Sequence, residues 1–443
     1  MATWWAERAW LGGPGTAAGV VLRTQGERLA AVTPGATSPP PGAVILPGLT
    51  LPGMVNAHSH AFHRALRGRS EGGRGTFWTW RQLMYAASGA LDPESYGRLA
   101  RAVYAEMAMA GFTAVGEFHY LHHRPGGAPY QDPNAMGRAL MGAARAAGVR
   151  LTLLDTLYLS SGFGDPPEGP QLRFADADAR AWERRVDQLD EDASVKVGAA
   201  IHSVRAVGPP AMETAASWSA RRQRPLHAHL SEQRSEHEEC QRRLAATPLE
   251  TMGRAGALDA AFTAVHGTHL SAMDVAQLAA AGGGCCLCPT TEADLGDGIG
   301  PFAALAEAGV ALSLGTDSHA SMDGFAEARG VEMGARLATG QRGVLDAPSL
   351  LQAATAGGAR ALGWDAGVLA PGRLADFITV APGAAHLAGV PVGPELVFAA
   401  TAADVGWVVV GGRAVVAGGR HLAVGDVAAE LGACIADLWD RVG

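Results

Sequence analysis

The chain of 443 residues is 48% hydrophobic and 18% charged, which is enough for one large domain of roughly 250–330 residues and a smaller one. Its net charge of −8, without any stretch rich in Lys and Arg, argues against a nucleic-acid partner, and without an apolar run of about 18 residues no membrane span is expected. The five cysteines are odd in number and clustered, and the N-terminus lacks the apolar segment of a signal peptide, so the cytoplasm is the simplest location.

Both ends of the chain read as short strands separated by turns rich in Gly and Pro. Neither end holds enough apolar residues to build a core of its own. We therefore expect residues 1–50 and 373–443 to combine in one small β-sandwich domain. Its expected strands are residues 19–22, 29–32, 43–46, 375–380, 405–410 and 413–417.

Residues 51–372 alternate apolar, strand-like runs with helix-like segments, which is typical of parallel α/β architecture. Three helix-like segments, 96–110, 135–147 and 302–308, end at a glycine, a residue that often terminates a helix. Eight βα units favour a closed (βα)8 barrel of the TIM type, with a doubly wound open sheet as the alternative. The eight expected strands are residues 53–57, 112–117, 150–155, 195–201, 225–229, 261–266, 284–288 and 310–315.

The first of these strands runs into His58 and His60. Residues i and i+2 of an extended chain point to the same side, so both imidazoles can address one point. Two neutral imidazoles that converge in this way suit a borderline metal such as zinc. The alternative is that both are polar residues of a solvated loop.

Polar residues follow most of the other predicted strands. In a βα barrel the carboxyl ends of all strands form one face, so these residues can share one centre. Three imidazoles and one carboxylate from this set would make a zinc site with room for water. The strand-end residues are His58 and His60, then Glu117, His119 and Tyr120, then His202 and Arg205, then His229 and Glu232, then His266, and finally Asp317.

Some of these positions have competitors. His229 is preferred to His227 because it lies nearer the strand end and Glu232 follows it. His266 is preferred to His269 because it directly follows the apolar run 261–265. Other residues allow simpler interpretations. Asp317 can cap a helix, and Arg81 and Arg205 can be surface ion-pair partners. Cys285, Cys286 and Cys288 could suggest a thiolate metal site, but they lie in an apolar run, so core filling is preferred. The simplest interpretation of Glu236, His237, Glu238 and Glu239 is a solvated helix face.

A second metal ion is not expected. His119, His122 and His123 could contribute ligands, but a second ion of the kind found in binuclear hydrolases would need a bridging lysine at the end of the fourth strand. Lys196 lies near the start of that strand instead. The pattern therefore favours one metal ion per chain.

Eight segments of the chain form a characteristic set, and they read NAHSHAFHRALRG, FWTWRQLMY, GEFHYLHH, IHSVRAV, HAHLSEQ, VHGTH, CPTTEADLGDG and GTDSHAS. In these segments the chain resembles the amidohydrolase superfamily in its mononuclear deaminase branch, and within it the formimidoylglutamate deiminases of histidine degradation. The segments at 77–85, 117–123 and 288–298 are the more specific ones. The resemblance covers nearly the whole chain, including the β-sandwich divided between its two ends.

The resemblance implies roles for particular residues. It implies one divalent metal per chain, usually Zn²⁺ with Fe²⁺ possible, a small dicarboxylate substrate and a homodimer. One position departs from the family, which usually has Gln where this chain has His63; an imidazole cannot copy the paired hydrogen bonds of an amide. The implied metal ligands are His58, His60, His229 and Asp317, the implied catalytic residues are Glu232, His266 and Asp317, and the implied substrate-binding residues are His63, Arg81, Tyr120, His202 and Arg205.

The expected reaction is hydrolysis of N-formimino-L-glutamate to N-formyl-L-glutamate and ammonia. Zinc lowers the pKa of bound water towards ~7, so that hydroxide can attack the formimino carbon while Asp317 accepts the proton. Glu232 would protonate the leaving nitrogen, and His266 would orient the attacking group. The two alternatives are an aminohydrolase of a purine, pyrimidine or triazine ring and a barrel without catalysis. Residues 68–75 are expected to form a mobile loop that, with the aromatic residues at 77–80, covers the site.

Overall fold

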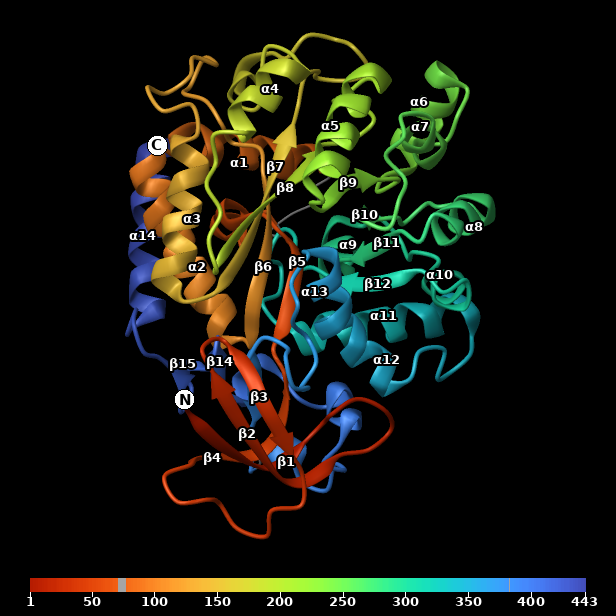
Figure 1. Cartoon of the computed structure of the whole chain (residues 1–443). Helices are drawn as coiled ribbons and strands as arrows, with labels where there is room; N and C mark the ends of the chain where they lie inside the picture. The colour runs from red at the N-terminus through yellow and green to blue at the C-terminus, as the bar shows by residue number, and fades with distance from the viewer. Residues whose placement is uncertain (71–76, 382) are drawn as a thin grey trace.

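The protein is described here from a computed structural model, which covers residues 1–70, 77–381 and 383–443. Two eight-stranded sheets organise these residues. Figure 1 shows a large helix-covered sheet above a smaller one, in which red N-terminal and blue C-terminal segments lie together. No helix in the described ranges has the length and apolar composition needed to cross a membrane.

The large sheet is a closed parallel barrel with strand order β12-β11-β10-β9-β8-β7-β6-β5. Its ends meet through a parallel bridge between Ser59 and Asp317, where the N–H groups of Thr316 and Asp317 donate to the His58 carbonyl at 3.1 and 3.0 Å. The predicted TIM-type barrel is therefore confirmed, and the open sheet is wrong. The strands are β5 (Met54–Ser59), β6 (Phe112–His119), β7 (Arg150–Leu157), β8 (Val195–Ile201), β9 (Leu226–Leu230), β10 (Phe262–His266), β11 (Gly284–Leu287) and β12 (Ala311–Leu314).

The helices begin and end at residues that suit those positions. Asp92 caps α2, where its side chain accepts the Ser95 N–H at 2.8 Å and Pro93 follows. Gly148 ends α3 in the left-handed conformation, with φ of 74°. The helices are α1 (Phe77–Ala90), α2 (Pro93–Met109), α3 (Ala135–Ala147), α4 (Ala179–Val186), α5 (Pro209–Arg222), α6 (Arg234–Leu244), α7 (Pro248–Arg254), α8 (Ala272–Ala280), α9 (Pro289–Leu295), α10 (Phe302–Glu307), α11 (Gly324–Thr339), α12 (Ala347–Gln352), α13 (Gly358–Ala361) and α14 (Val427–Val442).

The small sheet combines both ends of the chain, in the order β16-β15-β14-β13-β4-β1-β2-β3. β4 joins the two halves, because it pairs with β1 on one side and with β13 on the other. Trp4 packs edge-on against Phe377 and Trp407, with ring centroids 5.4 and 6.1 Å away. The strands are β1 (Thr3–Ala9), β2 (Ala17–Gln25), β3 (Arg28–Thr33), β4 (Val44–Pro52), β13 (Phe377–Val380), β14 (Val405–Val410), β15 (Arg413–Ala417) and β16 (Arg420–His421).

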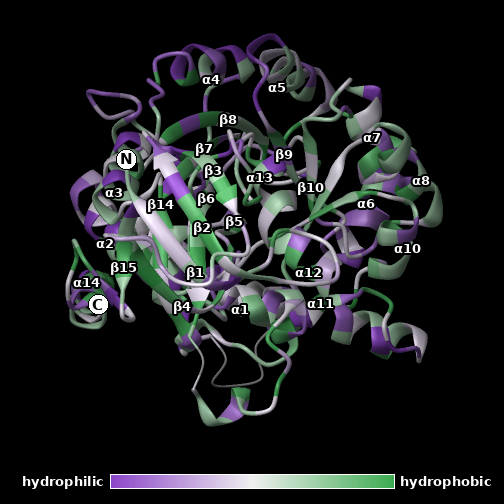
Figure 2. Cartoon of the chain, turned by 60° about the horizontal axis from the view of Figure 1, so that its bottom comes forward, coloured by the Kyte–Doolittle hydropathy of each residue, from purple (hydrophilic) through white to green (hydrophobic). Residues whose placement is uncertain are grey.

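The C-terminal helix α14 packs beside α1 and α2 of the barrel, as Figure 1 also shows for α2. The indole N–H of Trp439 donates to the Ala65 carbonyl at 2.9 Å. Figure 2 shows a largely hydrophobic β4 and hydrophilic stretches on outer helices such as α4, the pattern expected for a covered core. The predicted segment 373–443 thus contributes to both parts of the molecule.

A buried ion pair joins the barrel to the small sheet. Arg150, at the start of β7 and 1% exposed, donates to the two carboxylate oxygens of Asp376 at 2.7 and 3.2 Å. Its Nη1 also donates to Glu27 at 3.0 Å. Asp376 further accepts the N–H of Gly411 at 2.7 Å. The guanidinium therefore binds two carboxylates of the small sheet, and its Nη1 also donates to the Ala193 carbonyl of the barrel at 2.8 Å.

We expect Asp376→Ala to lower the free energy of unfolding by about 3–5 kcal/mol, because it leaves the buried Arg150 without its main counter-ion. Urea denaturation followed by circular dichroism measures this loss. Asp365→Ala is the control, since Asp365 pairs with Arg28 at the surface and such pairs contribute about 1 kcal/mol or less. Equal denaturation midpoints for the two variants would contradict the expectation.

Candidate metal centre and substrate pocket

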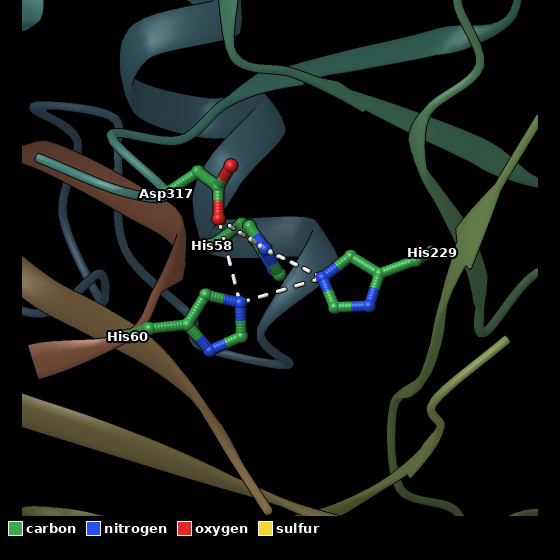
Figure 3. A group of neighbouring side chains, drawn as sticks. All are labelled: His58, His60, His229 and Asp317. Atoms are coloured by element: carbon green, nitrogen blue, oxygen red, sulfur yellow. Dashed lines mark hydrogen bonds and ion pairs between the residues drawn. The ribbon is translucent and has the colours of Figure 1, made fainter. Parts of the chain in front are cut away.

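The four predicted metal ligands converge at the carboxyl end of the barrel (Figure 3). His58 and His60 come from β5 and the residue after it, His229 from β9, and Asp317 from the loop after β12. The Nε2 atom of His229 lies 3.1 Å from that of His58 and 3.4 Å from that of His60. Oδ1 of Asp317 lies 3.2 and 3.4 Å from the same two histidine nitrogens. Ligand atoms of a tetrahedral zinc site with bonds of about 2.0–2.1 Å lie roughly 3.3 Å apart, so the spacing fits such an ion.

The hydrogen bonds of two histidines also fit a cation. Nδ1 of His60 contacts the Phe118 carbonyl at 2.9 Å, and Nδ1 of His229 contacts the His202 carbonyl at 2.9 Å. A carbonyl only accepts, so each Nδ1 carries the proton and each Nε2 keeps a lone pair. Two lone pairs that face each other at 3.4 Å repel, and a cation between them removes that repulsion. The donor set is therefore suited to a divalent metal.

Strained backbone positions surround this centre. Ser231, His266, Asp317 and His319 have φ angles of 51°, 69°, 41° and 61°, which side chains other than glycine rarely adopt. They follow or end the strands β9, β10 and β12. Such strain costs about 1–3 kcal/mol per residue and persists where the surroundings enforce it, typically at functional sites.

A buried chain of hydrogen bonds fixes the His58–His60 segment to its neighbours. Oγ1 of Thr316 contacts Nδ1 of His319 at 2.8 Å, and Nε2 of His319 lies 3.4 Å from Oγ of Ser59. Glu117 accepts the Ser59 hydroxyl at 3.1 Å and the Ala61 N–H at 2.8 Å. Burial raises the pKa of Glu117 to about 7, against the opposing effect of these donors. The sequence assigned no role to His319, although it lies in the quoted GTDSHAS segment.

Two further titratable residues adjoin the four ligands. Nε2 of His266 lies 3.9 Å from Oδ2 of Asp317, and its Nδ1 lies 3.4 Å from Oε1 of Glu292. Burial would lower the pKa of His266, but Glu232, Glu292 and Asp317 outweigh it and raise that pKa well above its usual value. Burial is also the main cause that raises the pKa of Glu232, which therefore holds a proton more readily than an exposed glutamate.

The competitors for these positions lie elsewhere. Nε2 of His227 contacts the Ala361 carbonyl at 2.9 Å, away from the ligand group. His269 is half-buried and does not line the pocket, whereas His266 does. Asp317 lies beside His58, which keeps the pKa of this carboxyl well below its usual range despite burial.

A cavity with about 80 Å³ of space for the centres of water molecules opens over this centre. All five predicted substrate-binding residues line it, together with Glu232, His266, Asp317 and the ligands His60 and His229. Trp80, one of the aromatic residues predicted to cover the site, also lines the cavity. The sequence analysis missed the other residues of the wall, which are Met84, Tyr85, Tyr158, Ser161, Phe174, Ser203, Ala206 and Leu295.

Protein partners orient the predicted substrate-binding residues. Nε of Arg81 donates to the Tyr85 hydroxyl at 2.6 Å. Nε2 of His63 lies 2.9 Å from the Tyr120 hydroxyl, so one of its two ring nitrogens is already engaged. Residues 71–76 of the predicted covering loop lie outside the described residues, but Trp80 of α1 lines the pocket.

The interpretation of residues 236–239 as a solvated helix face is wrong for its first member. Glu236 is 2% exposed, and its Oε2 accepts a hydrogen bond from Nε of Arg205 at 2.7 Å. The helical pattern of α6 could not reveal this, because the partner lies 31 residues earlier in the chain.

The other histidine cluster and the cysteines have structural surroundings. Both oxygens of Asp155, near His119 and His122, accept hydrogen bonds from Arg185 at 2.8 Å. A cation there would meet a guanidinium, so a second metal is disfavoured. The amino group of Lys196 donates to the Gly363 carbonyl, away from the ligand group. Cys285, Cys286 and Cys288 are buried.

Comparisons with known proteins give a consistent result. The model of the amidohydrolase family matches residues 49–415. A formimidoylglutamate deiminase from Pseudomonas aeruginosa is 40% identical over 86% of this chain and 87% of its own length. An amidohydrolase crystal structure from Brucella melitensis is 31% identical, with a TM-score of 0.90, over 99% of this chain and 100% of that one. An adenosine deaminase from Xanthomonas campestris with bound zinc shares the fold, at 24% identity and a TM-score of 0.86 over 100% and 98% of the two chains. The chain belongs to the amidohydrolase family.

Proposed function

We propose that this protein is a metal-dependent hydrolase that converts N-formimino-L-glutamate and water into N-formyl-L-glutamate and ammonia. The observation that carries the proposal is one cavity that joins a four-ligand metal centre to two arginines, Arg81 and Arg205. The 40% identity to a formimidoylglutamate deiminase supports it. Histidine degradation is the pathway that this reaction belongs to.

The chain's own residues can perform the proton transfers that the reaction needs. A divalent metal held by the four ligands would polarise water and lower its pKa towards ~7. Asp317, whose carboxylate stays ionised, accepts the proton of the attacking water. Glu232 delivers a proton to the nitrogen that leaves as ammonia, since amide anion does not leave. His266, beside Asp317, orients the attacking oxygen.

The pocket wall also suits the charge of the substrate. Formiminoglutamate carries two carboxylates, and a desolvated carboxylate needs paired donors. Arg81 and Arg205 offer planar guanidinium groups, and Tyr120 and His202 add neutral polar groups to the same wall. His63 belongs to this wall as well, with Nε2 turned to Tyr120.

The test is ammonia release from formiminoglutamate beside guanine and cytosine by the zinc-loaded protein. We expect release from formiminoglutamate alone. Arg205→Met is expected to raise KM for formiminoglutamate about 10- to 100-fold, because a hydrogen-bonded charge contributes about 1.5–3 kcal/mol. Release from a ring substrate that survives Arg205→Met would instead establish a ring aminohydrolase, and no release from any of the three would defeat the proposal.

The remaining assignments extend this proposal. We infer that the metal is Zn²⁺, one ion per chain, because three imidazoles and one carboxylate favour zinc, with Fe²⁺ as the alternative. Metal analysis of the purified protein distinguishes the two. A cytoplasmic location and a homodimer remain predictions, the latter tested by light scattering.

A further inference from the structure

Arg205 enters the pocket wall from the loop after β8, and only one of its three nitrogens is engaged by the described protein. Its Nε–H donates to Oε2 of Glu236 at 2.7 Å. No hydrogen bond from Nη1 or Nη2 of Arg205 to another described residue is found. A guanidinium is rigid and planar, so a partner at Nε fixes the direction of the two Nη groups. The edge formed by Nη1 and Nη2 remains, and such an edge can bind a carboxylate through two parallel hydrogen bonds.

Glu236 is itself held firmly. It is 2% exposed, and its second oxygen, Oε1, accepts the N–H of Ser231 at 3.0 Å. It also lies in the first turn of α6, where the helix dipole favours a negative charge. Both carboxylate oxygens are thus committed, one to the chain after β9 and one to Arg205.

The hydrogen bonds of Glu236 connect Arg205 to the carboxyl end of β9. Ser231 follows the β9 strand that carries the metal ligand His229, and it precedes Glu232. A carboxylate that bridges Ser231 and Arg205 therefore sets the position of the guanidinium relative to those two residues. Because Glu236 also balances the charge of Arg205, the half-buried guanidinium is oriented before any substrate arrives.

We propose that Glu236 is a positioning residue that orients Arg205, and through it determines the affinity of the pocket for a substrate carboxylate. The proposal rests on the proposed function for the identity of the substrate. Glu236 does not line the pocket; it acts through the direction of the Arg205 Nη groups.

The test is a double-mutant cycle on KM for formiminoglutamate, with glutarate as a competitive probe. Glu236→Ala is expected to raise KM and the glutarate Ki by the same factor, about 10-fold, because a charged hydrogen bond that orients Arg205 is lost. We expect kcat to change less than about 3-fold. In the Arg205→Met background, Glu236→Ala is expected to add nothing. Glu236→Gln, which keeps the shape and one acceptor, is expected to show a smaller rise and serves if the alanine variant does not fold.

The matched control is Glu239→Ala on the same helix, since Glu239 pairs with Arg242 and Arg243 on the outer surface. It is expected to leave KM, Ki and metal content unchanged. Wild-type KM in Glu236→Ala, or effects that add in the double variant, would overturn the inference while the proposed function stands. If the wild type binds glutarate, measured by calorimetry, without releasing ammonia from formiminoglutamate, the proposed function fails and the glutarate Kd of the same variants decides the inference. If the wild type neither binds glutarate nor releases ammonia from formiminoglutamate, both the inference and the proposed function are overturned.

Discussion

Replacing Glu232 with glutamine is expected to lower kcat roughly 10²- to 10⁴-fold, the usual contribution of a general acid or base. Glutamine keeps the size of the side chain but cannot hand a proton to the departing nitrogen. Glu232 is buried beside His266 and Asp317 but is not one of the four clustered ligands. Metal content is therefore expected to stay at the wild-type value, and KM to change little. Steady-state ammonia release together with metal analysis measures all three quantities.

The control for this prediction is Glu239→Gln, a change of the same kind on α6 at the surface. It should leave kcat as in the wild type. A Glu232→Gln protein that keeps more than about a tenth of kcat would contradict the assignment of the proton shuttle. Loss of the metal in that variant would show that Glu232 supports the ion rather than the proton transfer.

Replacing His229 with alanine is expected to abolish both tight metal binding and activity. The change removes one of the four predicted ligands, whose Nε2 lies 3.1 and 3.4 Å from Nε2 of His58 and His60. Metal affinity should fall by more than the roughly 10- to 100-fold that follows loss of an outer hydrogen-bond partner. Added Zn²⁺ should raise the melting temperature of the metal-free wild type, because the ion binds the folded state, and should leave that of His229→Ala unchanged.

His227→Asn is the matched control, because His227 lies two residues earlier on β9 and contacts the Ala361 carbonyl. It should retain the metal, and the zinc-dependent rise in melting temperature should persist. If His227→Asn loses the ion while His229→Ala retains it, the ligand assignment is wrong.

The barrel was predictable from the sequence because each strand is a short apolar run bounded by turns. The predicted run at 195–201 coincides with β8, and the others differ from the observed strands by one or two residues at one or both ends. β1 was missed, since its residues Thr3–Ala9 include Glu7 and Arg8, which interrupt the apolar pattern. The helix α14 was missed as well, because its buried face packs on α1 and α2, which are more than 300 residues earlier in the chain.

The chemistry-bearing residues were predictable where they end a strand, because the topology of a barrel places all such ends on one face. Residues that act through a partner side chain were not predictable from the sequence. Glu236 and Glu292 lie on helices, and their partners Arg205 and His266 are 31 and 26 residues away. The aromatic wall around Tyr158 and Phe174 was likewise invisible, since packing of large side chains leaves no polar signature in the sequence.

The seam between β5 and β12 has a consequence for how the protein matures. Asn56 and Thr316, which are bonded across that seam, are 260 residues apart, so a growing chain cannot make this contact until nearly three-quarters of it has been synthesised. His58 and Asp317 belong to the same junction. A metal ion that needs ligands from both strands could therefore be held only after the last strand has paired with the first.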